Sequence, residues 1–200
     1  MGGTTTATAA RHPTDSVSQA AVGRDIRALR KSRGLTLAEL ALEVGRSIGW
    51  MSQAERGRSA LSINDLRRIA QALDAPISWF FAHDGVPEAE RGYVVRAGSR
   101  RQIGSLEGGL VEELLSPDLG GAFEVVHAVF EPGAELEEWV TRPTEESGYI
   151  VEGEFDLWVG ARHFALRAGD SFRFAREPHR WRNPGTGRTV ILWVIAPPVY

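Results

Sequence analysis

The spacing of apolar residues changes partway along this 200-residue chain, and that change constrains the fold more than any other feature. From Val22 to Phe81, apolar residues recur at intervals of three and four, which is typical of amphipathic helices. From Phe123 to Ala196 they alternate with polar residues or form short runs between Gly, Pro and Asn, which is typical of strands. A chain of this length accommodates two domains that each bury a core. The sequence therefore predicts a multi-domain α + β protein, with a helical domain followed by an all-β domain.

Local start and stop signals divide the first part into five short helices. Thr36 and Glu39 form a Thr-x-x-Glu capping box, and Ser47 and Ser62 stand where the next two helices begin. Pro76 suits the first turn of a short fifth helix, PISWFF. The expected helix stops are three glycines, namely Gly34, Gly45 and Gly57. Short turns between these elements predict a compact five-helix bundle whose second and third helices form a helix-turn-helix.

The second part contains strand-like segments separated by closely spaced turns. Many short strands of this kind predict a β-sandwich or a β-barrel. The segments lie at residues 123–130, 153–160, 162–170, 170–175 and 188–196.

Composition and charge narrow the classes of function. No apolar run approaches the roughly 18 residues of a membrane span, and the polar start of the chain lacks the apolar segment of a secretory signal. The absence of cysteine removes disulfides, thiolate metal sites and thiol nucleophiles. Residues 19–75 hold ten Arg and Lys against six Asp and Glu, whereas residues 92–200 hold eleven against sixteen. We therefore expect a cytoplasmic protein, without a membrane partner, whose helical part alone can approach a polyanion.

Residues 24–81 carry an ordered set of motifs, which are RGLT, LAELA, G-x-S, S-Q-x-E-R-G and SINDLRRIAQAL. This segment resembles the XRE (phage-repressor-like) class of DNA-binding domains. In that class the third helix lies in the major groove of double-stranded DNA. The resemblance implies base-reading residues Ile48, Gly49, Ser52 and Gln53, and phosphate contacts from Arg46, Ser47, Arg56 and Arg58.

Chemistry supports part of this assignment. Gln53 can make the paired hydrogen bonds that adenine offers, worth roughly 1–3 kcal/mol of discrimination, and Ile48 can contact a thymine methyl group. Gly49 allows the helix to approach the bases closely. Leu37 stands where the class commonly has a phosphate-contacting glutamine, and Trp50 is expected to pack rather than to touch bases. Three arginines, Arg24, Arg27 and Arg30, suit either a solvated face or phosphate contacts.

Residues 132–185 carry PG, E-x-G-Y-x-x-E-G-E, A-G-D-S and P-H-R-W-R-N, and resemble the core of a cupin (double-stranded β-helix) barrel. Metal-binding cupins use two histidines, a glutamate and a third histidine. By that resemblance the ligand positions fall on Trp139, Thr141, Glu146 and His179. Two good ligands are too few for a tightly bound transition metal. We therefore expect no metal, no cofactor and no catalytic residues.

A barrel without a metal predicts a small-molecule site. A carboxylate such as Glu146 is costly beside a barrel interior unless it is paired, and an amine-bearing ligand or Arg142 would serve. Four aromatic residues, Trp158, Phe164, Phe172 and Trp193, are expected only to pack the barrel. The candidate effector pocket is Trp139, Thr141, Glu146, Tyr149, His179 and Trp181.

Together these resemblances predict a bacterial transcriptional regulator that binds a pseudo-palindromic DNA site as a homodimer and senses a small-molecule effector. Two alternatives remain at this point: a metal-dependent cupin enzyme of the epoxidase or dioxygenase type, and a ligand-binding module with a degenerate DNA head. The expected organisation is a disordered tail at 1–18, a helix-turn-helix domain at 19–82, a linker at 83–95 and a cupin effector domain at 96–200.

Overall fold

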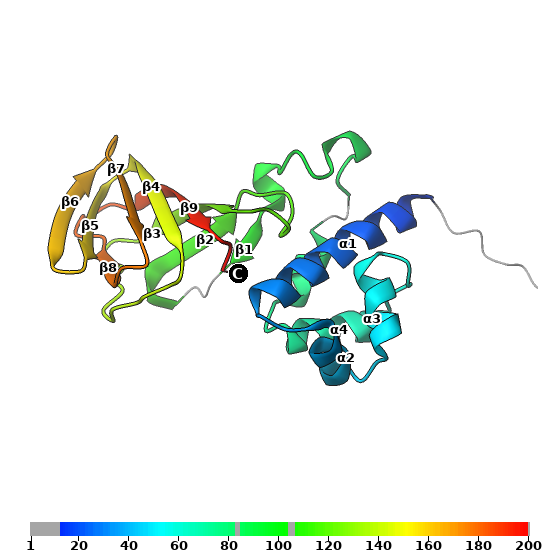
Figure 1. The fold of residues 1–200 in the computed structure, drawn as a ribbon. Helices are drawn as coiled ribbons and strands as arrows, with labels where there is room; N and C mark the ends of the chain where they lie inside the picture. Colours follow the sequence, from blue (N-terminus) through cyan, green and yellow to red (C-terminus); the bar gives the residue numbers. More distant parts are fainter. Residues whose placement is uncertain (1–12, 83–84, 104–106, 200) are drawn as a thin grey trace, which may run out of the picture. The chain divides into compact units, whose positions relative to one another are not determined.

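The computed structural model describes residues 13–82, 85–103 and 107–199. The chain divides into two compact units, Met1–Gly85 and Val86–Tyr200, and each is considered by itself (Figure 1). No helix among the described residues is both long enough and apolar enough to cross a membrane. The first unit is helical and the second consists mainly of strands, as the change of period predicts.

The helical unit contains four α-helices and a 3₁₀ helix in its described part. The fifth predicted helix is the 3₁₀ helix, so a bundle of five α-helices is not what forms. Helix α1 begins at Pro13, within the tail predicted at 1–18, and residues 1–12 lie outside the described part. The helices are α1 (Pro13–Ser32), α2 (Leu37–Val44), α3 (Ile48–Glu55), α4 (Ile63–Ala72) and η1 (Ile77–Phe81).

Short-range hydrogen bonds define where these helices begin and end. The predicted capping box is confirmed, since the Glu39 backbone N–H donates to Thr36 Oγ1 (3.2 Å) and the Thr36 N–H donates to Glu39 Oε2 (2.7 Å). Gly45 ends α2 in the left-handed conformation, with φ of 69°, where a side chain would be strained. The helices enclose a core of fully buried side chains that includes Ile26, Leu29, Leu40, Met51 and Ile69.

The second unit is built from two antiparallel sheets. Nine strands occur among its described residues: β1 (Arg101–Ile103), β2 (Leu110–Leu114), β3 (Glu124–Phe130), β4 (Glu145–Glu152), β5 (Glu154–Val159), β6 (Arg162–Arg167), β7 (Ser171–Ala175), β8 (His179–Arg182) and β9 (Thr189–Ala196). Three short 3₁₀ helices precede β2: η2 (Glu88–Glu90), η3 (Ala97–Ser99) and η4 (Glu107–Gly109).

The strand order leaves an open edge in the barrel. One sheet has the order β1-β2-β3-β9-β4-β7 and the other has the order β6-β5-β8. The two sheets enclose aromatic side chains, and Phe130 contacts Phe155, Trp181 and Trp193 with ring centroids 4.7–6.4 Å apart. Strands β6 and β7 are end strands in these sheets, so each has one side that pairs with no neighbouring strand. Figure 1 shows both strands on the left of the second unit.

Candidate nucleic-acid interface and barrel site

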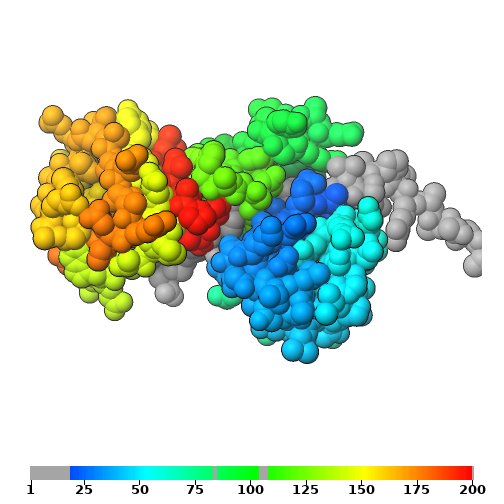
Figure 2. Space-filling view, viewed as in Figure 1, coloured from blue at the N-terminus to red at the C-terminus, as the bar shows by residue number. Residues whose placement is uncertain are grey.

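One face of α3, which includes Ile48, Gly49 and Gln53, is exposed, and the helix has a well-defined start. Ser47 caps the helix, because its Oγ accepts a hydrogen bond from the Trp50 backbone N–H (3.1 Å). Ile48 is 54% exposed although it is a large apolar residue, and Gln53 is also exposed. No atom lies within 4 Å of the position that a Cβ on Gly49 would take. Ser52 is half-buried. Figure 2 shows the blue-to-cyan residues of α2 and α3 at the surface of the helical unit.

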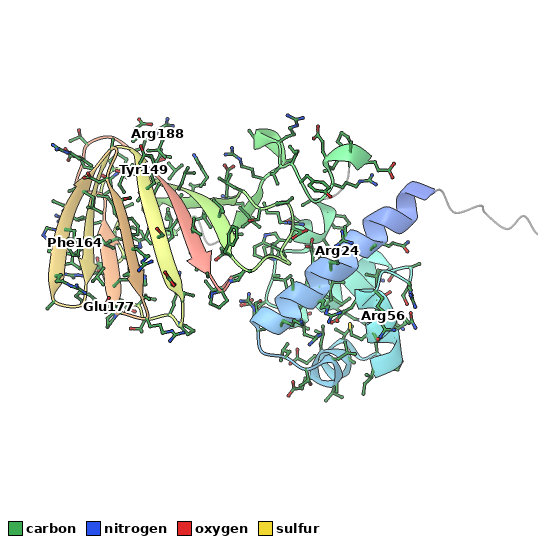
Figure 3. All side chains as sticks on the ribbon, turned by 45° about the horizontal axis from the view of Figure 1, so that its top comes forward. Arg24, Arg56, Tyr149, Phe164, Glu177 and Arg188 are labelled. Carbon is green, nitrogen blue, oxygen red and sulfur yellow. The ribbon has the colours of Figure 1, made fainter. Side chains whose placement is uncertain are left out.

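The four predicted phosphate contacts have different surroundings. Arg56 and Arg58 are exposed just beyond the C-terminus of α3, where Figure 3 labels Arg56. Arg46 instead forms an ion pair with Asp65 at the start of α4 (2.6 Å), and its guanidinium lies 5.0 Å from the Trp50 ring centre. Hydrogen bonds from Ser62 and then from Arg46 lower the pKa of Asp65 against the opposing effect of burial. Arg46 therefore joins α3 to α4, and Trp50 packs against it as expected.

A buried ion pair that the sequence reasoning did not single out joins α1 to the end of α3. Arg30 Nε lies 2.5 Å from Glu55 Oε1, and Arg30 Nη1 donates to the Leu35 carbonyl (2.8 Å). The side chains of Arg30 and Glu55 are only 12% and 6% exposed. The hydrogen bond to Glu55 raises the pKa of Arg30. Arg30 is therefore neither part of a solvated face nor available to phosphate, whereas Arg24 and Arg27 are exposed.

Glycine allows α1 to approach α3 closely at the same place. A Cβ on Gly23 would lie 2.5 Å from the Ala54 carbonyl oxygen, and one on Gly57 would overlap the backbone of Ala20. Gly57 also has φ of +66°, which disfavours any side chain there. The exposed face of α3 thus belongs to a helix whose C-terminal end packs closely against α1.

In the barrel, Glu146 and His179 are both buried, at 1% and 3% exposure. Glu146 Oε1 accepts a hydrogen bond from the Thr144 hydroxyl (2.7 Å), and Oε2 accepts one from Trp193 Nε1 (3.0 Å). Glu146 does have partners, as its burial requires, but the two observed are Thr144 and Trp193 rather than an amine or Arg142. Trp193, expected only to pack, also donates this hydrogen bond.

The other predicted pocket residues do not gather around Glu146. Tyr149 lies three residues further along β4, and because side chains alternate across a strand it points to the opposite, outer face, where it is 48% exposed. Trp181 is buried in the aromatic core beside Phe130. Trp139 and Thr141 are exposed, and Trp139 lies beneath Arg180, at 5.1 Å. Tyr149 therefore lies outside any pocket centred on Glu146 and His179.

Two inward-facing acids near Glu146 were missed by the sequence reasoning. Glu112 on β2 and Glu124 on β3 occupy strand faces that otherwise carry apolar residues. Burial raises the pKa of Glu124 to about 7, and burial also raises the pKa of Glu112. Burial lowers the pKa of His179, although the charge of Glu146 opposes this. The sequence contained a signal for Glu124. It precedes Val126, Ala128 and Phe130 at intervals of two, so the alternation places this glutamate on the inner face of the strand.

The residues at the cupin metal positions do not fit a metal ion. Trp139 and Thr141 replace two ligands, and both carboxylate oxygens of Glu146 accept hydrogen bonds from other side chains. His179 Nδ1 lies 3.3 Å from the Glu177 carbonyl oxygen. No group of three potential His, Cys, Asp or Glu ligands occurs within the part of the chain that the structure describes.

Comparison with known families and proteins agrees with both units. Residues 21–78 match the family described as helix-turn-helix domain, and residues 126–195 match the cupin domain family. The chain is 27% identical over 165 residues to the HTH-type transcriptional regulator SutR of Escherichia coli K12, covering 80% of this chain and 85% of SutR. It is 35% identical over 90 residues to an uncharacterized transcriptional regulator in the ATPase CF(0) region of Rhodospirillum rubrum, covering 41% of this chain and 83% of that protein.

Among solved structures, the chain is similar to an HTH_3 family transcriptional regulator from Vibrio cholerae, with 24% identity, 92% and 99% coverage of the two chains and a TM-score of 0.42. It is also similar to the hydroxypropylphosphonic acid epoxidase from S. wedmorenis, with 16% identity, 90% and 99% coverage and a TM-score of 0.43. Similarity at this level carries no information about function.

A helical unit with a capped, exposed α3, followed in the chain by a strand-rich unit, defines a class of protein: the DNA-binding helix-turn-helix proteins with an attached β-barrel. Within that class, the chain belongs to the XRE-like helix-turn-helix transcriptional regulators that carry a C-terminal cupin domain. The family predicted from the motifs is thus confirmed.

Proposed function

We propose that this regulator binds a specific pseudo-palindromic DNA sequence as a homodimer and that its cupin domain senses a small-molecule effector. The observation that carries the DNA part is the exposed start of α3, where Ile48, Gly49 and Gln53 face solvent. A single isoleucine that is 54% exposed is common on protein surfaces. Here, however, Ile48 lies next to Gly49 and Gln53 on one face of the helix. Such a face fits the major groove, where Gln53 would pair with adenine and Ile48 would contact a thymine methyl.

The same proposal assigns Arg56 and Arg58 to the phosphate backbone, together with Ser47 and the exposed part of Arg46. Contacts to phosphate position the protein without reading sequence. A dimer would place its two α3 helices about 34 Å apart, one turn of DNA, on a palindromic site. Ser52 is half-buried, so among the proposed base-reading residues it is the least accessible to a base. Because the target is chromosomal DNA of a bacterium, the proposed place of action is the cytoplasm.

The test begins with selection of bound sequences from a random duplex library, followed by fluorescence anisotropy titrations at several salt concentrations. Arg56→Ala should weaken binding to all sequences and reduce the slope of log affinity against log salt by about one. Gln53→Ala should mainly remove discrimination at one or two base pairs, by roughly 1–3 kcal/mol. Arg188→Ala is the matched control, since this exposed arginine lies at the start of β9 and pairs with Glu152 at 3.4 Å.

The assignment of roles fails if Arg56→Ala and Gln53→Ala cause the same loss on every sequence. The proposal as a whole fails if the wild-type protein selects no sequence, or if Arg188→Ala weakens DNA binding as much as Arg56→Ala does. Analytical ultracentrifugation with and without the selected duplex tests the homodimer, for which two chains per duplex are expected.

We further propose that the barrel is not an enzyme active site. The inward-facing pair Glu146 and His179 is the one feature that favours the alternative, a metal-dependent cupin enzyme. Metal analysis of protein purified without chelators decides between them. Iron, zinc or nickel at one ion per chain, lost in Glu146→Gln and His179→Gln, would overturn the sensor proposal in favour of the enzyme.

A further inference from the structure

A cavity of about 250 Å³ lies at the open edge of the barrel, among strands β5, β6 and β7. We call it the seam cavity. It lies apart from the six residues that the sequence assigned to an effector pocket, none of which lines it. Figure 3 labels Phe164 and Glu177, which both belong to it. Its lining is mixed: the apolar residues are Leu157, Val159, Phe164, Leu166, Phe172 and Phe174, and the polar or charged residues are Arg162, Ser171, Arg173 and Glu177.

We propose that the seam cavity binds a small amphipathic carboxylate, with an apolar body among the phenylalanines and its carboxylate at Arg162. This inference names the class of effector and rests on the proposed sensor function for its regulatory meaning. Binding itself is a separate property that can be measured without DNA.

The apolar part of the argument comes from the β5–β6 register. Phe164 is paired with Leu157, and Leu166 with Phe155, so these side chains share the inner face of the sheet. Leu157 and Phe155 are 1% and 0% exposed, but Phe164 is 41% exposed. The inner face of β6 is therefore apolar at Phe164 and Leu166 yet incompletely covered, and β6 is an end strand whose second side pairs with no strand. Covering Phe164 with apolar ligand atoms removes that surface from water, which favours binding.

The polar part comes from the charges in the lining. Two arginines stand against one glutamate, so the lining carries a surplus of one positive charge. Arg162 Nη2 contacts Glu177 Oε2 at 2.7 Å, and 62% of the Arg162 side chain remains exposed. A guanidinium has five N–H donors in a planar fork that suits a carboxylate. Arg162 can therefore donate hydrogen bonds to a ligand carboxylate beside Glu177, whereas Arg173 already pairs with Glu145 at 3.4 Å and contributes less.

The volume sets the size of the ligand. An apolar cavity of about 150 Å³ holds a benzene ring. A volume of about 250 Å³ therefore suits a ligand of roughly ten non-hydrogen atoms. Octanoate has that size, and octylamine has nearly the same shape with the opposite charge, so these two molecules are matched probes.

The experiment is isothermal titration calorimetry of the full chain with octanoate and with octylamine. We expect octanoate to bind and octylamine to bind about tenfold more weakly or not at all. Arg162→Gln should weaken octanoate binding about tenfold, and Phe164→Ser about fivefold. The matched controls are Arg188→Gln and Phe123→Ser, which alter an exposed arginine and an exposed phenylalanine outside the seam cavity and should leave the affinity unchanged. Amide chemical shifts should move mainly in β6 and β7.

Several outcomes would overturn the inference. Absence of octanoate binding to the folded wild-type protein does so, and so does equal binding of octylamine. Equal effects of Arg162→Gln and Arg188→Gln would show that the carboxylate is held elsewhere. If Phe164→Ser instead converts a dimer to monomers in the ultracentrifuge while octanoate has no effect, the seam cavity is a contact between two copies of the chain.

The same samples separate this inference from the proposed function. If octanoate binds with the expected dependence on Arg162 and Phe164 but leaves DNA affinity unchanged, the seam site stands and effector sensing by this route fails. If the protein binds its selected duplex but not octanoate, the seam inference fails and the DNA-binding proposal stands.

Discussion

The buried carboxyl group of Glu124 makes a quantitative prediction about how stability depends on pH. This side chain is 2% exposed on the inner face of β3. Its Oε1 accepts a hydrogen bond from the Val199 N–H at 3.4 Å, and its Oε2 has no hydrogen-bond partner among the described residues. Burial raises its pKa from 4.5 to about 7, and the nearby charges of Glu112 and Glu146 act in the same direction. The perturbation we consider is Glu124→Gln, which cannot ionise.

Whether stability rises or falls with pH depends on which state, folded or unfolded, holds the proton of Glu124. In the folded state the pKa of Glu124 is about 7, whereas in the unfolded chain it lies near 4.5. Between these values the folded state holds the proton and the unfolded state releases it, so stability falls as pH rises. Above about pH 7 Glu124 is ionised in both states, and stability falls no further on its account. At about 1.4 kcal/mol for each pKa unit, the difference gives an upper bound of about 3 kcal/mol. Below about pH 4.5 both states are protonated and the effect is absent.

The assay is urea unfolding at about pH 5 and about pH 8, followed by tryptophan fluorescence, since four of the six tryptophans lie in the strand-rich unit. Glu124→Gln should be about 1–3 kcal/mol more stable than wild type at pH 8 and close to it at pH 5. Glu131→Gln is the matched control, because Glu131 is exposed just after β3 and should follow wild type at both pH values. If Glu124→Gln has the same stability as wild type at both pH values, ionisation of Glu124 does not destabilise the folded protein and the prediction is wrong.

Three further substitutions test the helical unit. Gly49→Ala should stabilise the protein by about 0.5–1 kcal/mol, because no atom lies near the added methyl, yet it should weaken binding to the selected duplex by obstructing the groove-facing surface; unchanged DNA affinity would contradict that role. Gly23→Ala should destabilise it by about 1–3 kcal/mol in thermal melts, because the methyl would meet the Ala54 carbonyl, and a melting temperature equal to wild type would contradict the close packing. Glu55→Ala should cost about 3–5 kcal/mol in urea unfolding by leaving Arg30 buried and unpaired; a loss below about 1 kcal/mol would mean that the pair does not hold α1 to α3.

The elements that could be predicted depend on contacts between residues close in sequence. The Thr36–Glu39 capping box spans three residues, and Gly45 ends its helix through its own backbone conformation. The change of apolar period likewise distinguishes helix from strand without any distant partner. The sequence did not determine the type of the fifth helix, because five residues are too few to separate the α period from the 3₁₀ period.

Strands were missed where a functional or buried polar residue interrupts the alternation. In β2 and β4 the inner positions hold Glu112 and Glu146, so neither segment shows a clean apolar pattern. Strand β8 has four residues and carries arginines on its outer face. Tyr149 was misplaced for a simpler reason: a separation of three from Glu146 already puts the two on opposite faces of a strand, and the sequence could have excluded it.

From the sequence alone we could predict a helical part followed by a strand-rich part, the start of α3 and the likeness to the family, because these depend on periodicity, caps and motifs within a few residues. Only the tertiary structure decided that Glu146 pairs with Trp193, 47 residues away, and that Arg30 pairs with Glu55, 25 residues away. It also showed that β6 and β7 are end strands of different sheets and that residues of both line one cavity. Strand order and the partners of buried polar groups depend on how segments far apart in the sequence pack together. A pattern within a few residues carries no information about that packing.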